Sequence, residues 1–235
     1  MKIFARIRFY YSAFVISLIV SLMIPLLKLF PRHKDKILHY GNKTMMALMF
    51  AGIEKVGEPD PRAQLYLLNH QGIVDIITME ALLPINLNWV AKRELFEVPW
   101  FGHLLKNGEM IAIDRSDKRG LIKLLKDAKR SIEERHRPVA LFPEGTRAKG
   151  QKLLPFKDGA RFLAEKLGLV VQPVVVVGSK RVVNEHDKTS IGGDVKVIFL
   201  PSIDAKNAPE GWYERLRAQM QETIDRELES NALSR

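Results

Sequence analysis

The chain has 235 residues, of which 46% are hydrophobic, enough for one globular domain with a full-sized core and a short additional segment. It contains no cysteine, which excludes disulfides, thiolate metal sites and cysteine nucleophiles. The formal net charge of +10 predicts an anionic partner, which leaves nucleic acid, an anionic membrane surface or an anionic substrate as candidates.

The positive charge is concentrated near the amino terminus. Residues 1–40 hold seven Lys or Arg and one acidic residue, a net +6, whereas the other 195 residues hold 30 basic and 26 acidic ones, a net +4. Because most of the excess flanks an apolar segment, this distribution favours an anionic membrane surface over a nucleic-acid groove. We therefore expect no nucleic-acid partner.

The first apolar segment, residues 9–27, contains no charged residue and is followed by Pro31. Its length and the lack of a small-residue cleavage pattern do not suit a signal peptide. A helix over residues 9–24 rises roughly 24 Å, less than the ~30 Å hydrocarbon core of a bilayer. Pro25 is expected to kink or end that helix.

A second apolar stretch, residues 37–53, has its apolar side chains at helical spacing after a turn at residues 29–32. Three arrangements remain open: a helical hairpin that dips into one leaflet, a single spanning helix, and a soluble helix packed on the core. The hairpin is favoured, with both ends on the cytoplasmic face of the inner cell membrane, because basic residues flank both sides of the first segment.

The pattern changes at residues 59–61, Pro-Asp-Pro, which predicts membrane-associating helices over 1–58 and an α/β domain over 59–235. Short apolar runs then alternate with longer helical patterns. Such alternation predicts a largely parallel central sheet flanked by helices. The predicted strands are residues 65–68, 87–91, 110–113, 139–142, 169–177 and 195–200, and the predicted helices are 73–83, 118–135, 156–167 and 212–228.

The first predicted strand ends at His70, and Asp75 falls in the first turn of the next helix. The carboxylate is therefore able to orient the imidazole so that its second nitrogen acts as a base. An alternative interpretation is that Asp75 only caps the helix and His70 is a turn residue. The stretch alone does not decide between the two.

Cationic residues follow three other predicted strands: Lys92, Arg115 and Arg147. Ligands of open α/β sheets bind beyond the carboxyl ends of the strands, and arginine donates two hydrogen bonds at once to a phosphate. The sequence therefore predicts an anion site beside His70. No Gly-x-Ser-x-Gly elbow or nucleotide-binding glycine loop is found, and a third metal ligand is not evident, so we expect neither a metal nor a cofactor. What remains is a base that acts on a hydroxyl or amine of the substrate.

Residues 69–75, Asn-His-Gln-Gly-Ile-Val-Asp, resemble the His-x4-Asp motif of the glycerolipid acyltransferases, and residues 142–147, Phe-Pro-Glu-Gly-Thr-Arg, resemble their Glu-Gly-Thr-Arg motif. Residues 108–115 and 171–174 are similar to the two other motifs of that family. The four motifs occur in the family's order, and the resemblance covers roughly residues 65–178.

The resemblance implies that His70, held by Asp75, removes the proton from the sn-2 hydroxyl of lysophosphatidic acid, which then attacks the thioester of acyl-CoA or acyl carrier protein without an acyl-enzyme. Arg147, Arg115 and Lys92 are expected to bind the acceptor's phosphate. The residues expected to bind or orient the substrate are Asn69, Glu144, Gly145 and Thr146, with backbone N–H groups near Gly145 as candidates for stabilising the thioester oxyanion. The alternatives are another acceptor (glycerol-3-phosphate, a lysophospholipid or a lyso-aminolipid) or a non-catalytic lipid-binding protein at the membrane surface.

Overall fold

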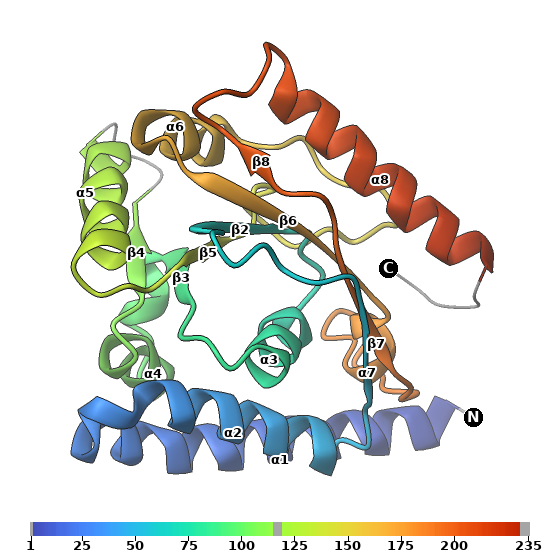
Figure 1. Ribbon diagram of the computed structural model, residues 1–235. Helices are drawn as coiled ribbons and strands as arrows, with labels where there is room; N and C mark the ends of the chain where they lie inside the picture. Colours follow the sequence, from blue (N-terminus) through green and yellow to red (C-terminus); the bar gives the residue numbers. More distant parts are fainter. Residues whose placement is uncertain (1, 115–118, 231–235) are drawn as a thin grey trace.

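The computed structural model describes residues 2–114 and 119–230, which form a mostly parallel sheet with helices on both faces (Figure 1). The strand order in these residues is β1-β7-β6-β2-β5-β3-β4, with β8 paired to β6. Among the described strands, both antiparallel pairs involve β6, one with β7 and one with β8. The predicted α/β class with a largely parallel sheet is confirmed. The strands are β1 (Ile53–Val56), β2 (Leu65–Leu68), β3 (Asn88–Lys92), β4 (Ile111–Ile113), β5 (Val139–Leu141), β6 (Val170–Val177), β7 (Val195–Phe199) and β8 (Ile203–Asp204).

The central strand β2 is buried on both faces, as expected of a parallel strand covered by helices on each side. Leu65 and Leu67 face one hydrophobic core, and Tyr66 and Leu68 face the other. Strands β5 and β6 flank β2 in parallel. The residue that follows β2 by two positions, His70, is therefore delivered to the middle of the sheet's carboxyl edge.

Helices cover the two faces in separate sets. One face carries α5 (Arg119–Glu133), α6 (Asp158–Leu167) and α8 (Trp212–Ser230), whose buried apolar residues share one core with the sheet. The other carries α3 (Ile73–Leu82), and below it α1 (Lys2–Leu29) and α2 (Lys34–Leu48) lie side by side (Figure 1). The short helices are η1 (Pro31–His33), η2 (Arg93–Phe96), α4 (Phe101–Asn107) and α7 (Ser179–Val182).

Helices α1 and α2 form the predicted hairpin, but with different bounds. Helix α1 continues through Pro25 to Leu29, so of the two expected effects of Pro25, a kink or an end, the end does not occur. Proline fixes φ near its helical value, and its missing N–H removes only the hydrogen bond to the carbonyl four residues earlier. Among the described helices, α1 is the one long and apolar enough to cross a membrane by length and composition.

The prediction of a second helix to residue 53 is also wrong. Helix α2 ends at Leu48, and Phe50 takes a left-handed backbone conformation with φ 53°. Residues 53–56 then form β1, which pairs in parallel with β7. The sheet thus begins before the boundary that Pro59 and Pro61 suggested. The sequence did not indicate β8, η2, α4 or α7.

Candidate active site

His70 and Asp75 meet across the loop between β2 and α3. The Nδ1 atom of His70 lies 3.0 Å from Oδ2 of Asp75. The same oxygen accepts hydrogen bonds from the backbone N–H groups of Gln71 at 2.6 Å and Gly72 at 2.9 Å. Asp75 therefore caps the amino terminus of α3 and contacts His70 at once, so its capping role does not conflict with orienting the imidazole.

Asp75 is fully buried, and its ionisation depends on its neighbours. Burial by itself raises the pKa of this carboxyl, but the hydrogen bond and charge of His70, together with the backbone N–H of Gly72, bring the pKa below its ordinary value. The ionised Asp75 accepts a hydrogen bond from Nδ1–H of His70. The lone pair available to act as a base is then on the other ring nitrogen, Nε2.

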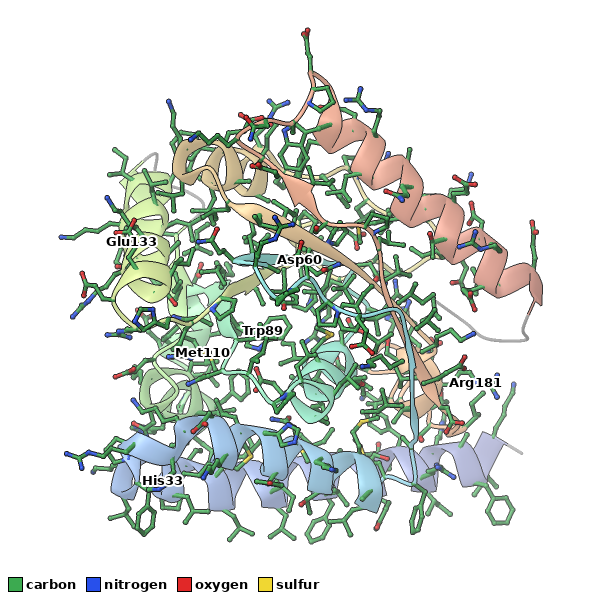
Figure 2. The ribbon with its side chains drawn as sticks, viewed as in Figure 1. His33, Asp60, Trp89, Met110, Glu133 and Arg181 are labelled. Carbon is green, nitrogen blue, oxygen red and sulfur yellow. The ribbon has the colours of Figure 1, made fainter. Side chains whose placement is uncertain are left out.

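Two aromatic rings fix the plane of the His70 imidazole. The ring of Phe142 stacks on it with centroids 3.7 Å apart and planes 14° from parallel, and Trp89 stacks on Phe142 at 5.4 Å. The indole N–H of Trp89 donates to the buried Glu80 carboxylate at 2.6 Å. Trp89 lies between the sheet and the helices α1–α3 (Figure 2). This column of rings was not predicted, although Phe142 directly precedes the Glu-Gly-Thr-Arg motif.

Glu144 ties the loop after β5 to the backbone of His70. Its two carboxylate oxygens accept from the N–H groups of His70 at 2.9 Å and Leu154 at 2.7 Å, and the side chain is buried. A second link runs from the Ala148 N–H to the carbonyl of His70 at 3.0 Å. The residue between these links, Arg147, is thereby held close to the loop that carries His70.

Arg147 forms an ion pair with Glu185. The second carboxylate oxygen of Glu185 accepts from the backbone N–H of Ile73, the first residue of α3, at 3.1 Å. Glu185 was not among the predicted site residues, and 38 positions separate it from Arg147, so no local pattern pointed to it.

Lys92, a further predicted cation among the described residues, is less closely tied to His70. Lys92 is exposed at the end of β3, where its ammonium pairs with Glu94 at 2.9 Å. Arg115 lies outside the described residues. Thr146 is exposed. The N–H of Gly145, a candidate for the thioester oxyanion, donates to the carbonyl of Phe142 at 3.0 Å and so closes a turn in which Gly145 has φ 74°.

Asn69 supports the site from behind. It is fully buried, and its amide bonds in both directions to the backbone of Val176 on β6, at 2.8 and 2.7 Å. Both polar ends of the side chain are thus used between strands, so Asn69 orients the end of β2 rather than facing a ligand.

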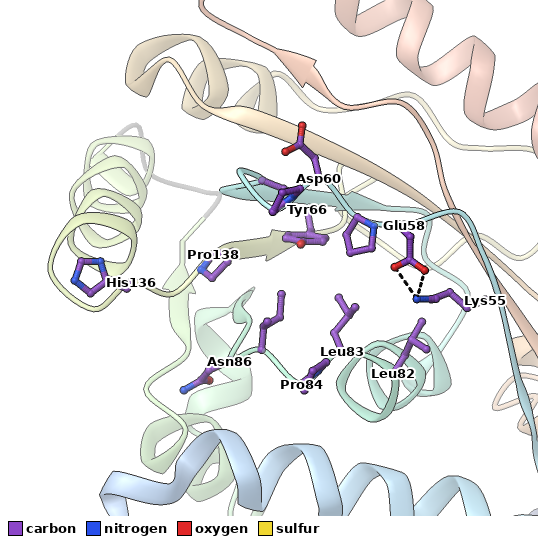
Figure 3. A pocket seen from close by; sticks show the side chains of 14 residues that line it. Lys55, Glu58, Asp60, Tyr66, Leu82, Leu83, Pro84, Asn86, His136 and Pro138 are labelled. Atoms are coloured by element: carbon purple, nitrogen blue, oxygen red, sulfur yellow. Dashed lines mark hydrogen bonds and ion pairs between the residues drawn. The ribbon is translucent and has the colours of Figure 1, made fainter.

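A cavity of about 530 Å³ opens at the opposite, amino-terminal edge of the sheet (Figure 3). Tyr66, Leu83 and Pro138 are among its walls, with the Lys55–Glu58 ion pair at one side. None of the predicted site residues lines it. Within residues 2–114 and 119–230, no group of three or more His, Asp or Glu side chains is arranged to hold a metal ion.

Comparisons with known proteins agree with this geometry. A family model described as Acyltransferase matches residues 50–177. A Helicobacter pylori protein named 1-acyl-sn-glycerol-3-phosphate acyltransferase is 42% identical over 176 residues, which are 74% of each chain. A Cocos nucifera protein of the same name is 35% identical over 115 residues, 49% of this chain and 37% of that protein.

The fold also matches a solved structure. The crystal structure of the 1-acyl-sn-glycerophosphate acyltransferase PlsC from Thermotoga maritima superposes with a TM-score of 0.71, covering 97% of this chain and 95% of that one at 22% identity. The family model spans more than half of the chain and the Helicobacter relative most of it. The chain therefore belongs to the Acyltransferase family and is an acyltransferase.

Proposed function

We propose that this enzyme transfers a fatty acyl group from acyl-CoA or acyl carrier protein to the sn-2 hydroxyl of 1-acyl-glycerol-3-phosphate, making phosphatidic acid. The observation that carries the proposal is the contact between His70 Nδ1 and the buried carboxylate of Asp75. The acceptor is the one named for the Helicobacter and Cocos relatives.

His70 acts as the general base through Nε2. It takes the proton of the acceptor hydroxyl as the oxygen attacks the thioester carbonyl, and Asp75 stabilises the imidazolium that forms. The tetrahedral intermediate then expels the donor's thiolate, which leaves readily without a strong general acid. No acyl-enzyme and no cofactor is needed, because the acceptor hydroxyl is itself the nucleophile.

Arg147 binds the phosphate of the acceptor, with Lys92 and Arg115 as further cations of the same site. The support for Arg147 is its place one residue before Ala148, whose N–H is bonded to the carbonyl of His70. A phosphate held there keeps the acceptor's sn-2 hydroxyl within reach of His70, and this positioning of the two reacting groups lowers the barrier.

The enzyme meets its lipid at the cytoplasmic face of the inner membrane through α1 and α2. The outer face of α1 exposes large apolar side chains at helical spacing, while its basic residues gather near both ends. Such a surface suits an anionic bilayer, where apolar burial and attraction to lipid phosphates act together. The exposed side chains are Ile3, Phe4, Ile7, Tyr10, Phe14, Leu18, Leu22, Leu26 and Leu29.

Replacement of His70 tests the proposal. His70→Ala should lower kcat for lysophosphatidic acid by roughly 10²- to 10⁴-fold, the usual contribution of a positioned base. Release of thiol from acyl-CoA in detergent micelles measures the rate. His103→Ala, an exposed histidine on α4, is the matched control and should retain activity. Full activity of a folded His70→Ala enzyme would refute the mechanism.

A further inference from the structure

The carboxylate of Glu185 contacts two groups that are also able to bind an anion from outside the chain. One carboxylate oxygen pairs with the guanidinium of Arg147, and the other accepts the N–H of Ile73 at 3.1 Å. Arginine and the free N–H groups at a helix amino terminus both bind phosphate in many proteins. A protein carboxylate thus makes contacts here that a phosphate oxygen is equally able to make.

The ion pair of Glu185 with Arg147 is accessible from solvent. The ion pair is only partly buried, with the Arg147 side chain 49% exposed and the Glu185 side chain 30% exposed. Solvent, and a dissolved ligand, can therefore reach both partners.

Glu185 is held in place by a closed turn. The backbones of Asn184 and Thr189 bond to each other in both directions, and the Asn184 side chain accepts the N–H groups of His186 and Asp187. Just before this turn, the Lys180 ammonium donates to the carbonyls of Ala148 and Lys149, directly after Arg147. The turn that carries Glu185 and the loop that carries Arg147 are therefore braced together, while the Glu185 side chain itself is tied only through its carboxylate.

We propose that Glu185 is a specificity-determining residue: its carboxylate occupies the position of the acceptor's phosphate between Arg147 and the amino terminus of α3, and an acceptor binds by displacing it. The inference rests on the proposed function, in which Arg147 binds that phosphate. Glu185 is then a competitor within the chain, and an acceptor must bind Arg147 and the Ile73 N–H more strongly than this carboxylate does.

The competition favours a phosphate monoester. A monoester carries about −1.5 to −2 charges at pH 7 and three strong acceptor oxygens, whereas the carboxylate carries one charge and two oxygens. A phosphodiester or a zwitterionic headgroup brings at most one negative charge and gains little over Glu185. The carboxylate thereby selects against acceptors that lack a free phosphate, at some cost in affinity for the correct one.

Glu185→Gln isolates the charge, because the amide oxygen of glutamine still accepts the N–H of Ile73. The KM for lysophosphatidic acid should fall about two- to fivefold with kcat unchanged, the ratio equivalent to about 0.4 to 1 kcal/mol for a partly exposed ion pair. Inorganic phosphate, used as a competitive inhibitor, should bind more tightly by the same factor. Glu214→Gln, which removes the exposed partner of Arg161, is the matched control and should change neither constant.

Arg147→Ala separates this inference from the proposed function. If Arg147→Ala leaves both constants unchanged, the phosphate role of Arg147 fails, and the role of Glu185 fails with it. If Arg147→Ala raises both constants but Glu185→Gln leaves them unchanged or raises them, only the inference about Glu185 is overturned. Two results support the inference: both constants fall in Glu185→Gln, and Glu185→Gln has no further effect in the Arg147→Ala background. The melting temperatures of all variants must show that each variant is folded.

Discussion

Several residues near the site each contact more than one neighbour. Asp75 caps α3 and contacts His70 through the same oxygen, and Phe142 directly follows β5 and stacks on the imidazole. Glu80, on α3, accepts the indole N–H of Trp89, and Trp89 connects it to His70 through the stacked ring of Phe142. Burial raises the pKa of Glu80 to about 7, although Trp89 and the charge of Arg137 act in the opposite direction. Its proton therefore links the stability of the fold to pH.

Glu80 should make the protein less stable as the pH rises. The folded-state pKa of about 7 lies above the ordinary value of 4.5, so the folded protein binds this proton more tightly than the unfolded chain does. The corresponding stability is fully present below pH 4.5 and is lost as the pH rises to about 7, roughly 3 kcal/mol in all.

Denaturant unfolding between pH 4 and pH 8 measures this effect. Glu80→Gln should remove the slope, because the amide oxygen still accepts from Trp89 while no charge is buried, whereas Glu97→Gln, an exposed residue, should leave the slope as it is. A slope that persists in Glu80→Gln would show that another group binds the proton.

At the scale of elements, the hairpin of α1 and α2 has two distinct sides. Its inner side buries Val15, Met23 and Leu27 of α1, and Gly41 of α2 lets the helices approach closely, since a Cβ there would lie 2.5 Å from the sulfur of Met23. Its outer side is apolar and exposed along the whole of α1. The inner side holds the hairpin to the domain. The outer side is therefore available for the proposed contact with the apolar part of a bilayer.

Ile7→Ser on the outer side of α1 should weaken membrane binding without weakening the fold. Ile7 is 60% exposed, so its replacement removes little packing, while the loss of a buried isoleucine from the bilayer costs about 1.5 to 3 kcal/mol. Partition to vesicles containing anionic lipid should fall roughly tenfold or more.

Ile122→Ser on α5, where isoleucine is 68% exposed, makes the same chemical change on a different helix. It should leave vesicle binding unchanged, and the melting temperatures of both variants should match that of the parent protein. Equal losses of binding in the two variants would mean that α1 has no special role at the membrane.

The whole molecule is built on two cores separated by the sheet, and the hairpin belongs to one of them. Leu38 and Met45 of α2 lie in the same buried cluster as Tyr66 and Leu68 of the central strand. Strand β1, which follows the hairpin, also pairs along β7. The amino-terminal segment is therefore part of the folded unit as well as the proposed membrane contact.

A chain that begins at residue 59 should fail to fold as a soluble monomer. It loses the helices that cover α3 and the strand that pairs with β7, which exposes a large apolar surface. Size-exclusion chromatography without detergent should show aggregates. A chain that begins at residue 50 keeps β1 and so separates the two losses; a monodisperse, cooperatively unfolding 59–235 fragment would contradict the prediction.

Much of the architecture follows from local patterns. Buried strands such as β2 and β6 are short apolar runs between polar turns, and their order with helices between them dictates a parallel sheet, so the carboxyl edge with His70 and Arg147 follows as well. Asp75 is predictable because five residues of chain separate it from His70. The apolar character of α1 follows from the absence of charged residues over positions 9–27.

Other features required the tertiary structure, because their partners are distant in sequence or their signal is ambiguous. Residue 53 reads as the end of an apolar helix, and only pairing with β7 makes residues 53–56 a strand. Phe142 meets His70, and Glu185 meets Arg147 and Ile73, only after β2, β5 and β6 lie side by side. The contact between His70 and Asp75 is thus local and readable in the sequence, whereas the contact between Glu185 and Arg147 is set by chain segments that folding alone brings together.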